Sequence, residues 1–364
     1  MKTPFKRLYF VYERYGGGAT MGCYQPSYVA NRDKIINASV ISLSILERNV
    51  HNYKDSLFIF FKKNPTLKIA NALNEGGNTF IYYTGDLSQE GFVNFLESDT
   101  SHLQGVIVGS QKFKDKIINR KKDTLVDVIP ANHDIFLESA GIRENKKFSL
   151  YYGGSPDYRG YLCQGELGLR KDWNYTSGYF NPLQEMIKQT SNSSFESREE
   201  YFKEKSIAGK CHDLQSQLSN NDCPLNYSCH YAVRSPWTTT VEKIKNNNMT
   251  LDIPYGSQWF TKTGGKLSTA AACNANVITS LDPSVRELID ENYPYAIDTE
   301  HNDFRNHWQE ICDEVFARAK EEFGTSKWNT GLKILKDVRV RTKTSRIVSD
   351  YVNFGIKIRE QGQK

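Results

Sequence analysis

The segment with the clearest capacity for chemistry runs from Lys262 to Ile278 and reads KTGGKLSTAAACNANVI. Its alanine-rich part predicts a helix over residues 266–274, and the N–H groups and dipole at such a helix start favour an anion. Lys266 adds a full positive charge, while Ser268 and Thr269 add hydroxyl donors. The segment therefore fits a diphosphate. The structural alternative is a helix capped by one of the hydroxyls, whose small residues permit close packing.

Two glycine-rich stretches follow predicted strands in a similar way. They contain Gly16, Gly17 and Gly18 near the N-terminus, and Gly153 and Gly154 near the middle of the chain. Glycine lets the backbone approach a ligand closely. The first stretch does not match Gly-x-Gly-x-x-Gly, so it does not indicate a dinucleotide site. A ligand-binding loop and a plain turn both fit it.

Candidate general bases also follow predicted strands. His133 and Asp134 end the segment VIPANHD, and Asp86 follows the segment YYTG. An imidazole or a carboxylate is suited to removing a proton from a hydroxyl. Arg234 could bind phosphate as a two-pronged donor or could cap the neighbouring loop. For His133 the structural alternative is a buried histidine at a strand end.

The cysteines and histidines do not indicate a metal site. The densest group comprises Cys211, His212, Cys223, Cys229 and His230, and its spacing matches no closed zinc pattern. The 7 cysteines of the chain are irregularly spaced and do not suggest a disulfide framework. We therefore predict no metal ligands.

Alternating strands and helices are predicted to position these groups in the first half. Short runs rich in Ile, Val, Phe and Tyr predict strands over residues 8–12, 57–61, 79–83, 105–108 and 125–129. Apolar spacing near 3.6 predicts intervening helices over residues 65–73, 89–96 and 111–119. Strands separated by helices are typical of βαβ units on a parallel sheet.

A second α/β unit is predicted beyond residue 146. Strands are expected over residues 147–152, 251–253 and 276–280, and helices over residues 237–246, 266–274, 283–290, 302–322 and 344–355. Residues 160–225 are polar and are interpreted as a surface insertion. Ligands of parallel sheets bind at the carboxyl ends of the strands. The chemistry is therefore expected in the loops after residues 12, 83, 129, 152, 234 and 280.

Composition excludes several classes of protein. The 364 residues carry 47 Lys and Arg against 42 Asp and Glu, and this net charge of +5 is too small for a nucleic-acid coat. No apolar run is long enough to span a bilayer, and the N-terminus lacks the pattern of a signal peptide. A cytoplasmic protein without nucleic-acid partners is expected. The basic run over residues 333–346 is a solvated face, a contact with an anionic membrane or a contact with an acidic acceptor.

In their order along the chain, these segments resemble the GT-B-fold glycosyltransferases. The resemblance rests on the N-terminal glycines, residues 79–86, 107–112, 128–134 and 151–154, and Lys266–Val277 with Glu287. It implies two Rossmann-like α/β domains that face a cleft. The acceptor-side domain would cover residues 1–145 and the nucleotide-sugar domain residues 146–335. A helical segment, residues 336–364, would cross back to the first domain.

The resemblance also assigns roles to the candidate residues. It implies that Lys266, Ser268 and Thr269 hold the donor phosphates and that Glu287 lies near the ribose. Arg234, Gly153 and Gly154 would complete the nucleotide-sugar site, Gly16–Gly18 the acceptor loop, and His133, Asp86 or Asp134 the base. The large retaining family has glutamates where this chain has Thr261 and Thr269. The stereochemical outcome is therefore left open.

The expected activity is transfer of a hexose or deoxyhexose from a nucleoside diphosphate to a hydroxyl of a glycan or lipid-linked acceptor. The resemblance implies that no metal or other cofactor takes part. Two alternatives share the architecture: a non-catalytic carbohydrate-binding protein and a nucleotide-sugar epimerase.

Overall fold

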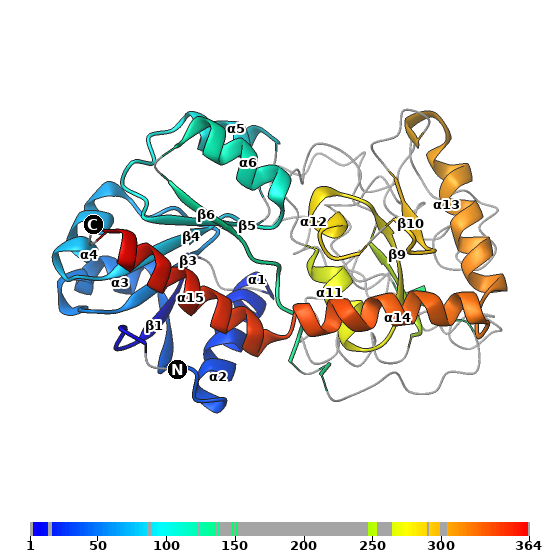
Figure 1. The fold of residues 1–364 in the computed structure, drawn as a ribbon, viewed down its shortest axis with the longest axis horizontal. Helices are drawn as coiled ribbons and strands as arrows, with labels where there is room; N and C mark the ends of the chain where they lie inside the picture. The colour runs from blue at the N-terminus through cyan, green and yellow to red at the C-terminus, as the bar shows by residue number, and fades with distance from the viewer. Residues whose placement is uncertain are drawn as a thin grey trace, which may run out of the picture.

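The computed structural model describes residues 3–13, 17–85, 87, 89–122, 124–135, 137–138, 148, 150–151, 247–252, 264–289, 291–298 and 304–362. These residues form two parallel sheets with helices packed around them (Figure 1). The last helix of the chain returns to the first sheet, so both ends of the chain lie on the same half.

The first sheet has six parallel strands in the order β2-β1-β3-β4-β5-β6. The strands are β1 (Leu8–Tyr12), β2 (Ala38–Ser42), β3 (Leu57–Phe61), β4 (Thr79–Tyr83), β5 (Gly105–Val108) and β6 (Leu125–Val128). After β2 the chain crosses to the other side of β1, so the order reverses between β1 and β3. Ligands of such sheets bind beyond the carboxyl ends of the strands, near such a reversal.

Helices connect these strands. They are α1 (Gly17–Ala19), η1 (Thr20–Tyr24), α2 (Gln25–Arg32), α3 (Leu43–Asn49), η2 (Val50–Asn52), α4 (Leu67–Glu75), α5 (Gln89–Glu97) and α6 (Gln111–Arg120). Side-chain caps begin two of them, because Ser42 accepts from the N–H of Ile45 and Thr66 from that of Ile69. The glycine-rich stretch is helical from Gly17 onward, so Gly17 and Gly18 do not belong to the loop or turn expected there.

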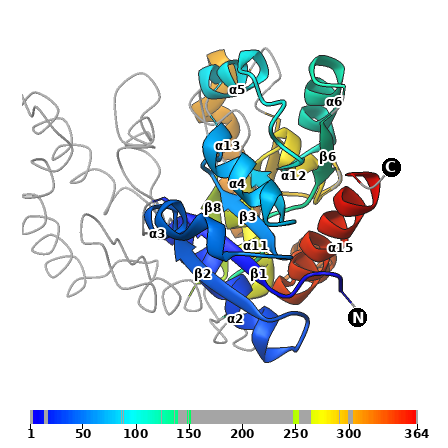
Figure 2. The same ribbon diagram turned by 90° about the vertical axis from the view of Figure 1, so that its left-hand side faces the viewer.

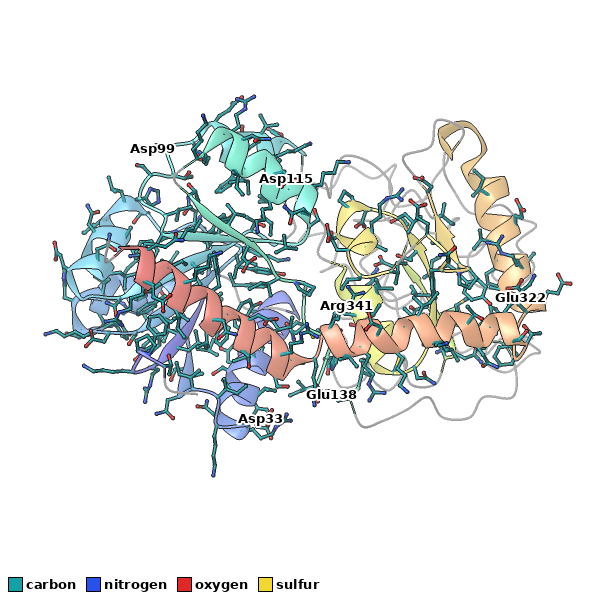
Figure 3. The ribbon with its side chains drawn as sticks, in the orientation of Figure 1. Asp33, Asp99, Asp115, Glu138, Glu322 and Arg341 are labelled. Atoms are coloured by element: carbon teal, nitrogen blue, oxygen red, sulfur yellow. The ribbon has the colours of Figure 1, made fainter. Side chains whose placement is uncertain are left out.

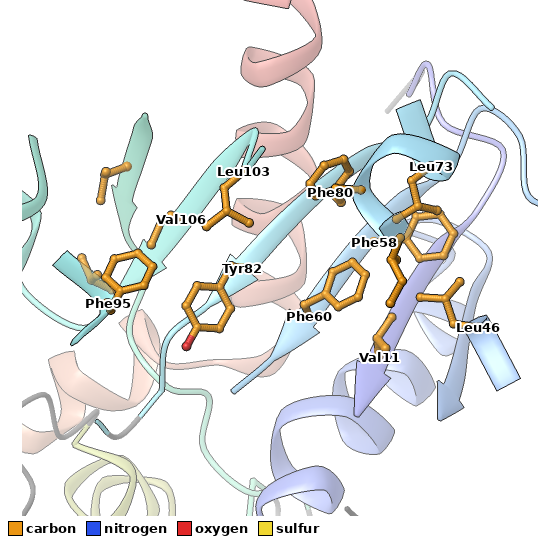
Figure 4. Packing of buried hydrophobic residues seen from close by; sticks show 14 of the residues in the cluster. Val11, Leu46, Phe58, Phe60, Leu73, Phe80, Tyr82, Phe95, Leu103 and Val106 are labelled. Carbon is orange, nitrogen blue, oxygen red and sulfur yellow. The ribbon is translucent and has the colours of Figure 1, made fainter. Parts of the chain in front are cut away.

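Both faces of the first sheet are buried, as expected of a parallel sheet. Alternate residues point to opposite faces, and Phe58, Phe60, Phe80 and Tyr82 pack under α3 to α6 (Figure 4). The other face carries Leu57, Ile59, Ile81 and Tyr83, which are covered by α2 and by the C-terminal helix.

The second sheet has the order β10-β9-β8-β7, and all of its pairs are parallel. Its strands are β7 (Leu150–Tyr151), β8 (Met249–Asp252), β9 (Asn276–Ser280) and β10 (Ala296–Ile297). Its helices are α11 (Gly265–Ala272), α12 (Pro283–Arg286), α13 (Phe304–Glu321) and α14 (Ser326–Arg341). The helix predicted over residues 283–290 is thus only one turn long.

The C-terminal helix α15 (Thr344–Gly362) packs against the first sheet (Figures 1 and 2). Its buried stripe contains Ile347, Val348, Tyr351 and Val352, the residues that the sequence places on one face. The predicted basic run turns out to be the end of α14 and the start of α15. Among the described residues, no helix is both long enough and apolar enough to cross a membrane.

Candidate functional site

Helix α11 begins at a left-handed glycine. Gly264 is its N-cap residue, with φ 67° and ψ 21°, a conformation that favours glycine. The first bond of the helix ladder runs from the N–H of Ser268 to the carbonyl of Gly264, at 3.0 Å. The N–H groups before Ser268 are therefore not used by the ladder, and such groups at a helix start favour an anion.

Lys266 lies in the first turn of α11 with its side chain 30% exposed. Its Nζ lies 3.9 Å from Oδ1 of Asp252, the fully buried last residue of β8. The exposed part of the side chain is its stem, because Nζ itself is buried and makes no hydrogen bond within the described residues. The 3.9 Å separation is too long for a hydrogen bond and makes this a loose ion pair. The sequence analysis did not name Asp252 as a site residue. It could have been found as an acidic residue near the end of a predicted strand.

The two hydroxyls predicted to hold phosphate are engaged inside the fold. Ser268 and Thr269 donate to the carbonyl of Gly265, at 2.9 and 2.7 Å, and Ser268 also approaches the carbonyl of Asn132 at 3.4 Å. Both side chains are buried. This arrangement matches the structural alternative, in which the small residues of the helix permit close packing. The contact with Asn132 also joins α11 to the segment that follows β6.

Glu287 bridges the two halves of the protein. Its Oε1 accepts the N–H of Gln111, the first residue of α6, at 2.8 Å. The neighbouring Leu288 packs at the start of α11, since a Cβ on Gly264 would lie 3.2 Å from its Cδ1. The beginnings of α6 and α11 therefore approach the same short segment, one from each half.

His133 and Asp134 lie in a buried junction after β6. The Nδ1 of His133 lies 3.1 Å from Oγ1 of Thr342, and its Nε2 lies 2.9 Å from Oε1 of Glu138. Asp134 is fully buried and accepts from Nε2 of Gln25 at 2.8 Å. In this arrangement neither side chain reaches solvent.

Electrostatics at the junction favour a charged Glu138. The hydrogen bond with His133 lowers the pKa of this carboxyl most strongly, and partial burial opposes that effect. The charges of His133, Lys343 and Arg32 lower the pKa further. The junction thus contains a carboxylate whose ionised form is stabilised by the fold.

Several predicted site residues lie outside the described part of the chain. They are Gly16, Asp86, Gly153, Gly154 and Arg234, and the cysteine-rich group over residues 211–230 is also outside it. Gly17 begins α1, and Gly18 is exposed near the ring of Phe61. Within the ranges that the structure describes, no group of three or more His, Cys, Asp or Glu residues could hold a metal ion.

Comparison with protein-family models and with curated proteins finds no match. Solved structures do match over nearly the whole chain. HepE from Anabaena, in complex with UDP and glucose, has a TM-score of 0.53 and 12% identity, over 99% of this chain and 100% of that one. A glycosyltransferase from Rickettsia africae has a TM-score of 0.57 and 10% identity, over 97% of this chain and 98% of that one.

The N-terminal domain of trehalose-6-phosphate phosphatase from Candida albicans is also similar. Its TM-score is 0.55 at 10% identity, over 98% of this chain and 97% of that one. Likeness at such low identity concerns the fold. The predicted fold class is therefore confirmed: the chain has two Rossmann-like α/β units of the GT-B type, with a C-terminal helix that returns to the first.

Proposed function

We propose that the protein is a glycosyltransferase that moves a sugar from a nucleoside diphosphate to an acceptor hydroxyl. The observation that carries the proposal is the start of α11, where N–H groups outside the helix ladder and the Lys266 ammonium lie close to the segment that contacts helix α6 of the first half. The fold supports it, since HepE shares this fold and was solved with UDP and glucose.

In the proposed reaction the helix start and Lys266 stabilise the diphosphate as it leaves the sugar. Charge develops on the diphosphate in the transition state, and oriented donors that are already in place stabilise that charge. A base takes the proton of the acceptor hydroxyl, which then attacks the anomeric carbon. Exclusion of water limits hydrolysis of the donor.

Asp86 is the base that we favour among the three candidates. His133 and Asp134 are buried in the junction, with exposures of 1% and 0%, so an acceptor hydroxyl cannot reach them in this arrangement. Asp86 follows the last residue of β4 by three positions in the sequence, and β4 is a central strand of the first sheet. Ligands bind at such ends in parallel sheets.

The finer features of the proposal come from the sequence analysis. We propose a hexose or deoxyhexose as the transferred sugar, a glycan or lipid-linked acceptor, catalysis without a metal, and a cytoplasmic location. The proposed division is residues 1–145, 146–335 and 336–364. Exposed Lys333, Lys336, Lys343 and Arg346 are the proposed contact with an anionic membrane surface.

Calorimetry with UDP and GDP tests the proposal directly. We expect one of them to bind the wild type, and we expect Lys266→Ala to weaken that binding about tenfold, the loss of one charge-assisted contact. Lys327→Ala is the matched control, because Lys327 is a 75% exposed lysine of α14 that pairs with Glu322, a residue between α13 and α14. Equal affinities of the wild type and Lys266→Ala would contradict the proposal.

A screen of UDP-, GDP- and dTDP-sugars by thermal shift identifies the donor. Bound ligand stabilises a fold by RT ln(1 + [L]/Kd), about 2.7 kcal/mol at a hundredfold excess over Kd. Stabilisation by free sugars alone would support a carbohydrate-binding protein instead. Consumption of the donor without any acceptor would support an epimerase.

A further inference from the structure

Lys62, the first residue after β3, has an unusual backbone conformation for a lysine. Its φ is 59°, in the left-handed region that residues other than glycine rarely adopt. The conformation is held in place, because the N–H of Lys62 donates to the carbonyl of Tyr83, the last residue of β4, at 2.9 Å. Uncommon backbone conformations concentrate at functional sites, so this lysine is a candidate for a role beyond packing.

The side chain of Lys62 is supported by two neighbours. Its stem lies against Gly85, where a Cβ would come within 2.5 Å of Cγ and 2.6 Å of Cε of the lysine. Only a glycine leaves this space for the stem. The ammonium lies 5.4 Å from the centroid of the Phe61 ring, within the range of a cation–π contact. The residue as a whole is exposed, so its charge is held at a fixed place on the surface of the first half.

The loops after β1 and β3 flank the point where the strand order of the first sheet reverses. Glu13 follows β1, and its Oε1 lies 2.9 Å from Nζ of Lys63, the second residue after β3. Among the described residues of these two loops, one carboxylate thus stands against two ammonium groups. Ligands of parallel sheets bind near such a reversal, and Lys62 makes the charge there positive.

The carboxyl end of the first sheet faces the second half. The N–H of Gln111, after β5, donates to Glu287 at 2.8 Å, and the carbonyl of Asn132, after β6, lies 3.4 Å from Oγ of Ser268 in α11. Figure 3 shows Arg341 at the end of α14, where the two halves meet, and its guanidinium donates to the carbonyl of Glu287 at 2.7 Å. Lys62 therefore lies at the end of the sheet that is nearer to the proposed diphosphate site.

We propose that Lys62 binds an anionic group, a phosphate or a carboxylate, of the acceptor substrate. The proposal rests on the proposed function, and its new element is the charge of the acceptor together with the residue that recognises it. Gly85, which supports the lysine, is the residue before Asp86, the base that we favour. An ammonium group is a compact point charge that attracts either anion, so the experiment includes both.

Three sugars that differ only at C6 test the proposal: glucose, glucose 6-phosphate and glucuronate. Calorimetry is carried out at a saturating concentration of the nucleoside diphosphate that the wild type binds, which fills the proposed phosphate site at Lys266. We expect the wild type to bind at least one charged sugar about tenfold more tightly than glucose, the effect of one charge-assisted contact. Which of the two it prefers distinguishes a phosphate from a carboxylate.

Variants of the lysine separate charge from packing. Lys62→Met keeps an unbranched stem without the charge, and it should lose the preference for the charged sugar while its affinity for glucose and for the nucleotide stays unchanged. Lys62→Arg should retain the preference. Lys68→Met is the matched control, because Lys68 is an exposed lysine of α4, and it should behave like the wild type.

The outcomes are distinguishable. If the wild type binds no nucleotide, the proposed function fails and this inference fails with it. If it binds nucleotide but neither charged sugar more tightly than glucose, only the inference is overturned. The same holds if Lys62→Met keeps the preference or loses all three sugars equally, as a lysine with a packing role alone would. Should Lys62→Met not fold, Lys62→Gly, which suits the left-handed backbone, must show the same selective loss.

Discussion

Nε2 of His133 lies 2.9 Å from Oε1 of Glu138, in the segment that follows the last strand of the first sheet. The backbone of His133 is tied to the same place, because its N–H donates to the carbonyl of Thr342 at 3.0 Å and its carbonyl accepts from Thr344 Oγ1 at 3.0 Å. Thr342 and Thr344 flank the step from α14 to α15. His133 thus connects the segment that follows β6 to the junction between α14 and α15.

Acid should weaken this junction. The folded-state pKa of Glu138 lies below its usual 4.5, so the contact stabilises the fold above that value and is lost as the pH falls through the folded-state pKa. Glu138→Gln should lower the free energy of unfolding by about 1.5–3 kcal/mol at pH 7, the typical range for a hydrogen bond to a charged group. Urea unfolding at pH 7 and below pH 4.5 should show this gap closing, and a gap that does not change with pH would contradict the interpretation.

Lys266 and Asp252 should couple only weakly. Their 3.9 Å separation, too long for a hydrogen bond, predicts a coupling free energy of about 0.5–1 kcal/mol in a double-mutant cycle of Lys266→Met and Asp252→Asn. Thermal or urea unfolding of the four proteins measures this coupling. A coupling of about 3 kcal/mol or more would mean that the ammonium is committed to the fold, and the proposed phosphate role would then lose its basis.

The strands of the first sheet could be predicted because each is a short apolar run. Residues 8–12, 57–61, 79–83 and 105–108 form strands with the predicted bounds. Strand β2 was missed because it is an edge strand whose residues are all only partly buried, so the run ASVIS has no strong apolar pattern. Helix α14 was missed because its lysines and arginines were interpreted only as a basic surface, and its helical spacing was not considered.

The candidate site was predictable only where its signal is local. A helix start with glycines and a lysine can be recognised from neighbouring residues, and α11 begins within one residue of the predicted position. The contact between Gln111 and Glu287 joins residues 176 positions apart, and one partner is a backbone N–H, which has no sequence signature. Arg341 likewise acts on carbonyl groups, so its role follows from the tertiary fold alone.

Gly22→Ala should destabilise the first half strongly. A Cβ at this position would lie 2.1 Å from Cε2 of Phe61, so the ring of Phe61 or the helix must move. Overpacking of this kind costs about 1–3 kcal/mol. Combining it with Phe61→Leu should recover part of the loss in thermal unfolding. A Gly22→Ala protein as stable as the wild type would show that the helix and the strand are less tightly packed than described.

The last prediction concerns the return of α15 to the first sheet. Tyr351 is 2% exposed, and its ring packs edge-on against those of Phe10 and Tyr83, at centroid distances of 6.2 and 6.4 Å. Tyr351→Ala should therefore lower the free energy of unfolding by about 3–5 kcal/mol, the cost of a large cavity in a core. Tyr351→Phe, which keeps the ring, should cost about 1 kcal/mol or less, because no described residue shares a hydrogen bond with the hydroxyl. Limited proteolysis should cut α15 faster in the alanine variant alone; equal rates in both variants would indicate that the ring does not anchor the helix.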